Sequence, residues 1–179
     1  MYVEQNDNVT DLVVDPHTLN EKQKIIFERV ESHYKALILN PGNVEALNVI
    51  VMGTAGTGKL YLINMIRSRL QEIARNHNIE HLPILVLAPT GVAAFNIRGV
   101  IIHSALSISI SNNKLNLNSE RLKKLQKKLE GVEYLIIDEK SMVERRMLAL
   151  IDMRLRQASP EKQNKVFGRR SIILVGDFG

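Results

Sequence analysis

Apolar residues along this chain follow two spacings, one typical of helices and one typical of buried strands. Between Asn20 and Asn40 they recur every three or four positions, which predicts a helix that ends at Pro41-Gly42. The same spacing predicts further helices over about 59–77, 90–97, 119–129 and 142–157. In the last helix we expect the inward-facing residues to be Met142, Leu148, Ile151 and Leu155.

Short, mainly apolar segments predict strands that are buried inside a sheet. They cover residues 47–52 (LNVIVM), 84–88 (ILVLA), 133–138 (EYLIID) and 171–177 (SIILVGD). Because these runs alternate with the predicted helices, we expect a three-layer α/β fold whose mainly parallel sheet has helices on both faces. Residues 107–118 are polar and rich in turn-forming residues, which predicts a loop.

The two ends of the sequence are less informative. Residues 1–18 show no period, so we expect them to be loosely ordered. The sequence stops at Gly179, directly after a predicted strand, and we expect residues 19–179 to form an incomplete domain of a longer protein. The N-terminus does not resemble a secretory signal, and no apolar run reaches the roughly 18 residues that a membrane span requires.

Composition narrows the chemistry and hints at a partner. The sequence contains no cysteine, which excludes disulfides, thiolate zinc sites and cysteine nucleophiles and fits an intracellular, reducing compartment. The net charge of +5 is uneven, because residues 1–50 contribute −4 and residues 51–179 contribute +9. This excess favours a polyanionic partner such as nucleic acid, although a solvated basic surface would also account for it.

The segment GTAGTGK has the spacing of a phosphate-binding loop, and we call residues 53–59 the phosphate loop. It follows a predicted strand and opens a predicted helix, so its backbone N–H groups can surround phosphate oxygens at the helix N-terminus. Lys59 would reach the β- and γ-phosphates. The residues that we expect to contact ATP here are Gly53, Thr54, Ala55, Gly56, Thr57, Gly58, Lys59 and Leu60.

Leu60 departs from this motif. The position normally holds Ser or Thr, whose hydroxyl is a direct ligand of Mg²⁺. Leucine offers no oxygen, whereas Mg²⁺ demands near-octahedral oxygen coordination. We therefore predict that nucleotide binding is weakened but retained and that hydrolysis is strongly impaired.

Two carboxylates, Asp138 and Glu139, stand at the end of the apolar run 134–137. In a phosphate-loop fold we expect this strand to run beside the loop strand, which would place Asp138 near the Mg²⁺ of MgATP. Glu139 would then act as general base on the attacking water. An ordinary strand followed by a charged turn is the alternative interpretation.

Three further segments carry a family resemblance. LAPTGVAAFNIRGVIIHSAL (87–106), LIIDEKSMV (135–143) and ILVGDFG (173–179) follow the phosphate loop in the order and rough spacing of one family. They resemble the petite-integration-frequency (PIF-type) DNA helicases of superfamily one, including the helicase parts of Helitron transposons. The resemblance covers roughly residues 19–179.

The resemblance implies an activity and partners. Members of this family hydrolyse ATP with Mg²⁺, move 5′ to 3′ on single-stranded DNA and unwind forked duplex, with roles in DNA repair, recombination and telomere maintenance. Their core is a pair of RecA-like domains that enclose ATP, and this chain would be the first of the pair, without the second. A nuclear or mitochondrial location is also implied.

The same resemblance assigns roles to individual residues. Gln23 matches the glutamine that contacts adenine, although Asn20-x-x-Gln23 is also a plausible capping box. Thr90 and Gly91 match a segment that contacts the DNA backbone, with an ordinary helix cap as the alternative. His103 matches the next DNA-contacting segment, although a structural role would also explain it.

Other residues match the family pattern in part or depart from it. Gly176-Asp177-Phe178 matches the start of the segment that couples ATP to DNA, and no companion motifs support a protein-kinase interpretation of the letters DFG. Ile101 stands where the family usually has Thr, and Lys140 would weaken Mg²⁺ attraction if it pointed inward. The helix 119–129 is basic and amphipathic, which fits a solvated face or DNA backbone contact.

We therefore predict the ATP-binding half of a PIF-type helicase. The competing hypothesis, which Leu60 favours, is a catalytically inactive fragment that binds nucleotide or DNA. A small nucleotide kinase is disfavoured by the APTGVAA segment.

Overall fold

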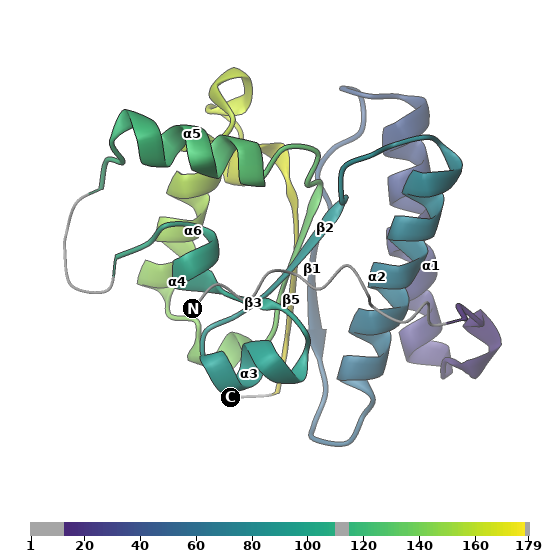
Figure 1. Cartoon of the computed structure of the whole chain (residues 1–179). Helices are drawn as coiled ribbons and strands as arrows, with labels where there is room; N and C mark the ends of the chain where they lie inside the picture. The colour runs from purple at the N-terminus through teal and green to yellow at the C-terminus, as the bar shows by residue number, and fades with distance from the viewer. Residues whose placement is uncertain (1–12, 110–114, 178–179) are drawn as a thin grey trace.

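The structure is a computed structural model that describes residues 13–109 and 115–177. Within these ranges, five strands form one sheet in the order β1-β5-β4-β2-β3, and every neighbouring pair is parallel (Figure 1). The strands are β1 (Asn48–Met52), β2 (Ile84–Ala88), β3 (Val100–Ile101), β4 (Tyr134–Ile137) and β5 (Ser171–Gly176).

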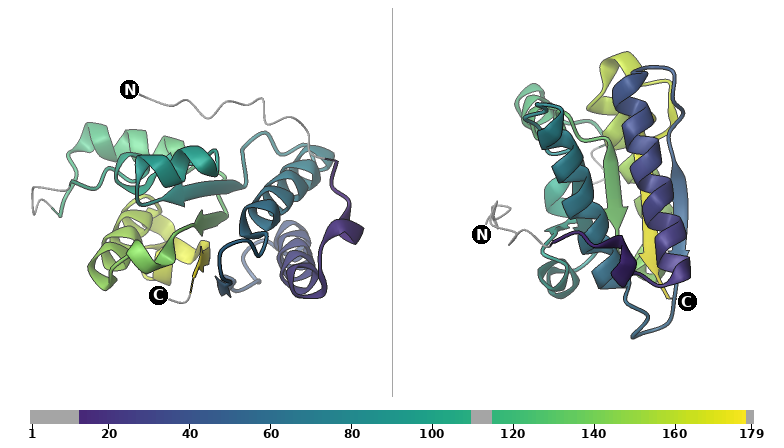
Figure 2. Two further views of the ribbon diagram at one scale, coloured as in Figure 1. Left: turned by 90° about the horizontal axis from the view of Figure 1, so that it is seen from below. Right: turned by 90° about the vertical axis from the view of Figure 1, so that its right-hand side faces the viewer.

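Helices cover both faces of this sheet, which confirms the expected three-layer α/β fold. Figures 1 and 2 show α1 (Glu21–Leu39) and α2 (Lys59–Asn76) side by side on one face. The other face carries α4 (Ile102–Ala105), α5 (Ser119–Lys128) and α6 (Arg145–Gln157). The short helix α3 (Gly91–Asn96) lies at the end of the sheet where the strands terminate.

The central strands β2 and β4 are apolar at every position because each face packs on a separate core. In β2, Ile84, Val86 and Ala88 join the core formed with α1 and α2. Leu85 and Leu87, which alternate with them, join the core formed with α4, α5 and α6. Successive side chains of a strand point to opposite faces, so a strand buried on both faces loses the usual alternation of polar and apolar residues.

The prediction of a buried strand at residues 47–52 is wrong for β1. This strand forms one edge of the sheet, and only Val51 is buried. Ile50 is 61% exposed and Met52 44% exposed, because none of the described helices covers the face to which they point. The composition of the apolar run does not distinguish an edge position from a central one.

The strand order also corrects the expected neighbour of the loop strand. We expected the strand that carries Asp138 and Glu139 to run beside β1, but β5 lies between β1 and β4. Register aligns Met52 with Gly176 and Ile137 with Leu174. The acidic pair therefore reaches the phosphate loop across the end of β5.

Element boundaries follow the local capping chemistry. Asn20 caps α1 through the predicted capping box with Gln23, and both reciprocal hydrogen bonds are present. The last predicted helix begins at Arg145, because residues 140–142 form a separate 3-10 turn. Met142 is 55% exposed in that turn, so the prediction that it faces inward is wrong, whereas Ile151 and Leu155 are fully buried.

Some segments were not predicted, and others lie outside the described residues. The two-residue β3 and the single-turn α4 are too short to carry a detectable period. Pro16–Thr18 forms a 3-10 turn whose Thr18 hydroxyl lies 2.6 Å from the Tyr61 hydroxyl on α2. Predictions that concern residues 1–12, 110–114 and 178–179 fall outside the described residues.

Candidate nucleotide site

The phosphate loop joins β1 to α2 at the carboxyl end of the sheet. Gly58 is the N-cap of α2 with φ 76°, a left-handed conformation that glycine adopts without strain. No side chain caps this helix, so its first N–H groups remain available to an anion. The local geometry is that of an anion-binding loop at a helix N-terminus.

Gln23 supports this loop from α1. Its side-chain oxygen accepts a hydrogen bond from the Asn20 N–H in the capping box (3.0 Å), which fixes the orientation of the amide. Its Nε2 then donates to the carbonyl oxygens of Thr57 and Gly58, both at 3.2 Å. Both amide protons are thus engaged by the loop, so contact with adenine would require the exchange of one of these bonds.

The left-handed φ of 76° accounts for glycine at position 58, and the Gln23 side chain packs closely against it. A Cβ added at Gly58 would lie 2.6 Å from Gln23 Nε2, closer than real contacts allow. The support that Gln23 gives to the phosphate loop could not be read from the sequence, because it depends on α1 lying directly beside the start of α2.

Lys59 folds back across the loop. Its ammonium donates to the carbonyl oxygens of Gly53 (2.6 Å) and Thr54 (2.9 Å) and forms an ion pair with Asp177 at 2.5 Å. Asp177 directly follows β5, and β5 is the strand paired with the loop strand. The sequence resemblance had marked Asp177 only as part of a motif and gave no indication of this partner.

Asp138 and Glu139 lie at the same end of the sheet as the phosphate loop. The Asp138 N–H donates to the Leu87 carbonyl oxygen at 2.9 Å, which extends the β4–β2 pairing by one residue. Tyr134 and Ile136 face the core of α1 and α2, so strand alternation turns Asp138 toward the same face as α2. Asp138 is half-buried, whereas Glu139 is exposed.

Glu139 adopts an unusual backbone conformation. Its φ is 55° and its ψ 46°, in the left-handed region that residues with a Cβ rarely occupy. It precedes the 3-10 turn of residues 140–142, so this conformation turns the chain sharply away from β4. Strained residues of this kind often mark functional sites, which supports Glu139 as a site residue.

Lys140 packs against the end of β5. A Cβ added at Gly176 would lie 2.8 Å from Lys140 Cγ and 2.9 Å from its backbone nitrogen, so only glycine fits there. The Gly53 N–H in turn donates to the Gly176 carbonyl oxygen at 3.2 Å. The close packing at Gly176 therefore brings the phosphate loop, the acidic turn and the end of β5 together.

The residues at the carboxyl end of the sheet fit a Mg²⁺ ion that binds together with a nucleotide. Among the described residues, no group of three or more His, Asp or Glu side chains is arranged to hold a metal. Mg²⁺ commonly binds one or two carboxylates, with phosphate oxygens and waters completing its coordination. Asp138 can supply one carboxylate, whereas Leu60, which is 44% exposed at the start of α2, supplies no oxygen.

The segment predicted to contact DNA lies at the same end of the sheet (Figure 1). The Thr90 hydroxyl accepts a hydrogen bond from the Ala93 N–H at 3.2 Å, which confirms that Thr90 is the N-cap of α3. As an acceptor it keeps its own proton, which can still be donated to a phosphate oxygen. Gly91 is exposed next to it, and His103 is half-buried on α4.

The exposed surface of α3 carries two large apolar side chains that sequence reasoning missed. Val92 is 75% exposed and Phe95 84% exposed, three residues apart on one side of the helix. The opposite side is anchored by buried Ala94 and Ile97. The exposed pair is therefore displayed on a fixed helix, and its only sequence indication was an aromatic residue within a predicted short helix.

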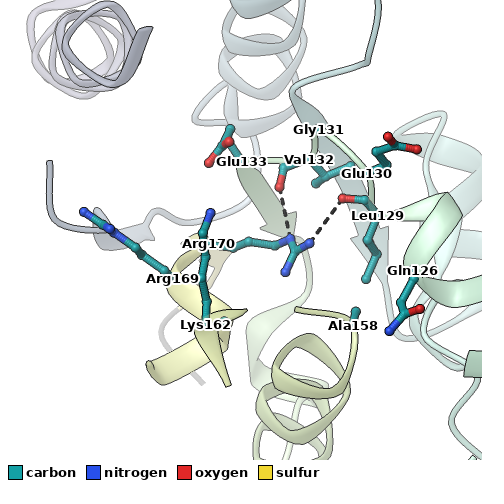
Figure 3. Close-up of a pocket in the computed structure, with 11 residues that line it drawn as sticks. Gln126, Leu129, Glu130, Gly131, Val132, Glu133, Ala158, Lys162, Arg169 and Arg170 are labelled. Atoms are coloured by element: carbon teal, nitrogen blue, oxygen red, sulfur yellow. Dashed lines mark hydrogen bonds between the residues drawn. The ribbon is translucent and has the colours of Figure 1, made fainter. Parts of the chain in front are cut away.

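A pocket of about 220 Å³ lies at the opposite end of the sheet, away from these residues. It surrounds the buried side chain of Arg170, whose guanidinium reaches the carbonyl oxygens of Val132 (3.0 Å) and Leu129 (3.2 Å) (Figure 3). Arg170 also donates to Leu155 and Ser159, so it joins the C-terminal ends of α5 and α6 to the start of β5. Burial lowers the pKa of this guanidinium. Its donors are used within the fold, which marks this pocket as structural.

Comparison with known proteins places these features in a family. A family model described as PIF1-like helicase matches residues 18–179. The chain is 32% identical over 134 residues to the ATP-dependent DNA helicase Pif1 of Psychrobacter sp., covering 73% of this chain and 19% of that protein. It is 33% identical over 134 residues to the ATP-dependent DNA helicase PIF1 of Saccharomyces cerevisiae, covering 73% of this chain and 15% of that protein.

Solved structures agree with this match. The crystal structure of Pif1 helicase from Bacteroides in complex with ADP-AlF3 and ssDNA is 29% identical and superposes with a TM-score of 0.66. The match covers 89% of this chain and 32% of that chain. The chain thus spans a third or less of the length of these relatives, and the fold is the one found in their RecA-like phosphate-loop domain.

Proposed function

The chain belongs to the PIF1-like helicase family, and from that premise we propose that it is the N-terminal ATP-binding part of an ATP-dependent 5′-to-3′ DNA helicase. The observation that carries this proposal is the convergence of Lys59, Asp138 and Glu139 at one end of the sheet. The phosphates of a nucleoside triphosphate bound in the phosphate loop would lie near the side chains of these three residues.

Each residue then has a distinct role. Lys59 would stabilise negative charge on the transferred phosphoryl group, and Asp138 would hold Mg²⁺. The chemistry that Mg²⁺ would supply when bound is neutralisation of the negative charge on the phosphates. The exposed carboxylate of Glu139 would orient the attacking water and accept its proton. Gln23 would set the shape of the loop and, after exchanging one hydrogen bond, contact adenine.

We propose single-stranded and forked DNA as the second partner, bound along α3 and α4. Thr90 and Gly91 would contact the phosphate backbone, and His103 would extend this contact. The exposed Phe95 suits stacking on a base, which binds single strands without regard to sequence. Related structures were solved with ssDNA and at forked dsDNA, which supports this choice of partner.

The cellular location and biological role of this activity are further proposals. No helix among the described residues is long and apolar enough to cross a membrane. A nuclear or mitochondrial location and a role in DNA repair, recombination or telomere maintenance are supported by family membership alone.

The alternative function is nucleotide binding without turnover, and Leu60 is the observation that favours it. The effect of Leu60 on Mg²⁺ binding is tested first. ATP affinity is measured with Mg²⁺ and with EDTA for the wild type, for Leu60→Ser and for the matched control Leu60→Ala. We expect Mg²⁺ to change the wild-type and Leu60→Ala affinities by less than about twofold and to tighten Leu60→Ser roughly three- to tenfold, as one added metal ligand would.

Turnover is tested in a protein that also carries a second RecA-like half. We expect DNA-stimulated ATP hydrolysis to be slow with Leu60 and to rise with Leu60→Ser. Wild-type turnover as fast as that of the Ser variant would show that the missing hydroxyl is unimportant. No turnover in either protein would favour the inactive alternative.

A further inference from the structure

The Lys59 ammonium has no proton left for a phosphate. A lysine ammonium has three N–H donors. In this chain they are directed to Gly53 O at 2.6 Å, Thr54 O at 2.9 Å and Asp177 Oδ1 at 2.5 Å. Lys59 is mostly buried, with 19% of its side chain exposed, whereas Asp177 is 54% exposed. The lysine is thus enclosed by the loop on one side and by Asp177 on the other.

A phosphate oxygen that binds Lys59 must displace one of these three acceptors. The two carbonyl oxygens belong to the loop itself, so their bonds to Lys59 hold the loop in shape. Asp177 is the only charged acceptor of the three, and a phosphate oxygen that replaces it keeps a negative partner beside the ammonium. The exchange of Asp177 for phosphate is therefore the least disruptive of the three.

We propose that Asp177 occupies the phosphate position at Lys59 in the nucleotide-free protein and is displaced when nucleotide binds. This inference rests on the proposed nucleotide-binding function and adds a positioning residue to it. Asp177 would hold Lys59 in its folded-back position and oppose binding in two ways, by competing for the ammonium and by repelling the phosphates.

The position of Asp177 links this exchange to the sheet. Asp177 follows Gly176, whose carbonyl oxygen accepts from the Gly53 N–H at 3.2 Å, so the backbone on both sides of the ion pair is held. The movement expected on nucleotide binding is therefore confined to the Asp177 side chain. Nucleotide in the phosphate loop would release the Asp177 carboxylate from Lys59 and leave the pairing of β5 with β1 intact.

The test is the affinity for ADP measured in EDTA, so that metal coordination makes no contribution. We expect Asp177→Asn to bind ADP roughly two- to fivefold more tightly than the wild type, the range that corresponds to loss of one half-exposed ion pair. Glu161→Gln removes the same charge from an exposed site at the far end of the molecule and is the matched control. Its affinity should equal that of the wild type.

A second comparison isolates the contact with Lys59. In a Lys59→Ala background, the gain from Asp177→Asn should shrink, because the competition for the ammonium is gone and only repulsion remains. Unchanged or weaker ADP binding by Asp177→Asn overturns the inference while leaving nucleotide binding in place. If neither the wild type nor Asp177→Asn binds ADP, both the inference and the proposed function fail. Binding by Asp177→Asn alone would support the exchange most strongly.

Discussion

Gln23 joins two structural tasks in one side chain, and a conservative substitution separates them. Gln23→Glu keeps an oxygen for the Asn20 N–H and a favourable charge in the first turn of α1, but it places carboxylate oxygen against the Thr57 and Gly58 carbonyls. We expect Gln23→Glu to lower the free energy of unfolding by about 1 kcal/mol, because both loop hydrogen bonds are lost. Gln23→Ala should lower it by about 2 kcal/mol, because it also loses the hydrogen bond from the Asn20 N–H.

Pyrophosphate binding then reports on the loop, because pyrophosphate carries no base. We expect Gln23→Glu to weaken it about tenfold, as unpaired loop carbonyls facing a carboxylate would. Wild-type pyrophosphate affinity in this variant, together with loss of ADP affinity, would instead assign Gln23 to adenine contact alone.

The backbone of Glu139 leads to a second prediction. A residue with a Cβ in the left-handed region is destabilised by roughly 1 kcal/mol, and glycine escapes this strain. With φ at 55°, Glu139→Gly should therefore unfold at higher urea concentration than Glu139→Ala, by about 1 kcal/mol in free energy. Both substitutions remove the carboxylate, so any difference between them reports on the backbone. Equal stability of the two variants would show that the position is unstrained.

At the scale of elements, the pair α1–α2 matters because α1 presents Gln23 and α2 begins at the phosphate loop. Glu31 on α1 accepts from Arg69 on α2 at 3.0 and 3.2 Å and from Lys35 at 2.6 Å. Burial alone would raise the pKa of the Glu31 carboxyl, but the hydrogen bonds from Arg69 and Lys35 outweigh it and leave the pKa below 4.5.

This pKa shift gives a signed pH dependence. A carboxyl group whose pKa is lower in the folded state stabilises the fold above its unfolded pKa, and this stability is lost as pH falls through the folded value. Glu31→Gln should therefore reduce the free energy of unfolding at pH 7 and flatten its decline below pH 4.5. Urea unfolding at pH 7 and at about pH 3 measures both effects. If the free energy of unfolding of Glu31→Gln falls with pH as steeply as that of the wild type, the decline arises from other carboxylates.

The proposal that the exposed Phe95 ring on α3 stacks on a base is tested by measuring the binding of single-stranded DNA. Phe95→Ala should weaken binding of an oligothymidine by about 1–2 kcal/mol if the ring stacks on a base. It should leave stability within about 0.5 kcal/mol of the wild type, because the side chain is 84% exposed. Phe95→Tyr is the matched control and should bind as the wild type does. Equal binding by the Ala variant would remove Phe95 from the DNA surface.

The elements that the sequence predicted well are those whose environment is uniform along their length. Residues 84–88 are buried on both faces, so their apolar run identified β2. The run 48–52 looked similar, yet β1 is an edge strand, because sheet order arises from long-range pairing that composition does not encode. The capping box at Asn20 and Gln23 was predictable because it is local.

Long-range contacts explain why the site was predicted only in part. The motif spacing identified the phosphate loop, but Lys59 and Asp177 meet only because β1 and β5 are neighbours. The expectation that the acidic strand neighbours the loop strand was wrong for the same reason. Side-chain contacts between residues more than a hundred positions apart require the folded arrangement.

At the scale of the whole molecule, the candidate binding residues all lie at one end of the parallel sheet. The phosphate loop, the acidic turn at 138–139, Asp177 and α3 all follow carboxyl ends of strands, where ligands bind in open α/β sheets. The opposite end holds Arg170, whose hydrogen bonds to the carbonyl oxygens of Leu129 and Leu155 join the C-terminal ends of α5 and α6 and stabilise the fold. One end of the domain is thus available for binding, and the other is committed to packing.

The most direct test of this account is the equilibrium affinity of the chain for ATP, measured by calorimetry in EDTA for the wild type and for Lys59→Ala. The account predicts saturable binding at one site and at least a roughly tenfold loss of affinity in Lys59→Ala, the loss expected when a charged phosphate contact is removed. Circular dichroism of both proteins would verify equal folding. Absence of wild-type binding, or equal affinity in the two proteins, would contradict the assignment of residues 53–59 as the nucleotide site.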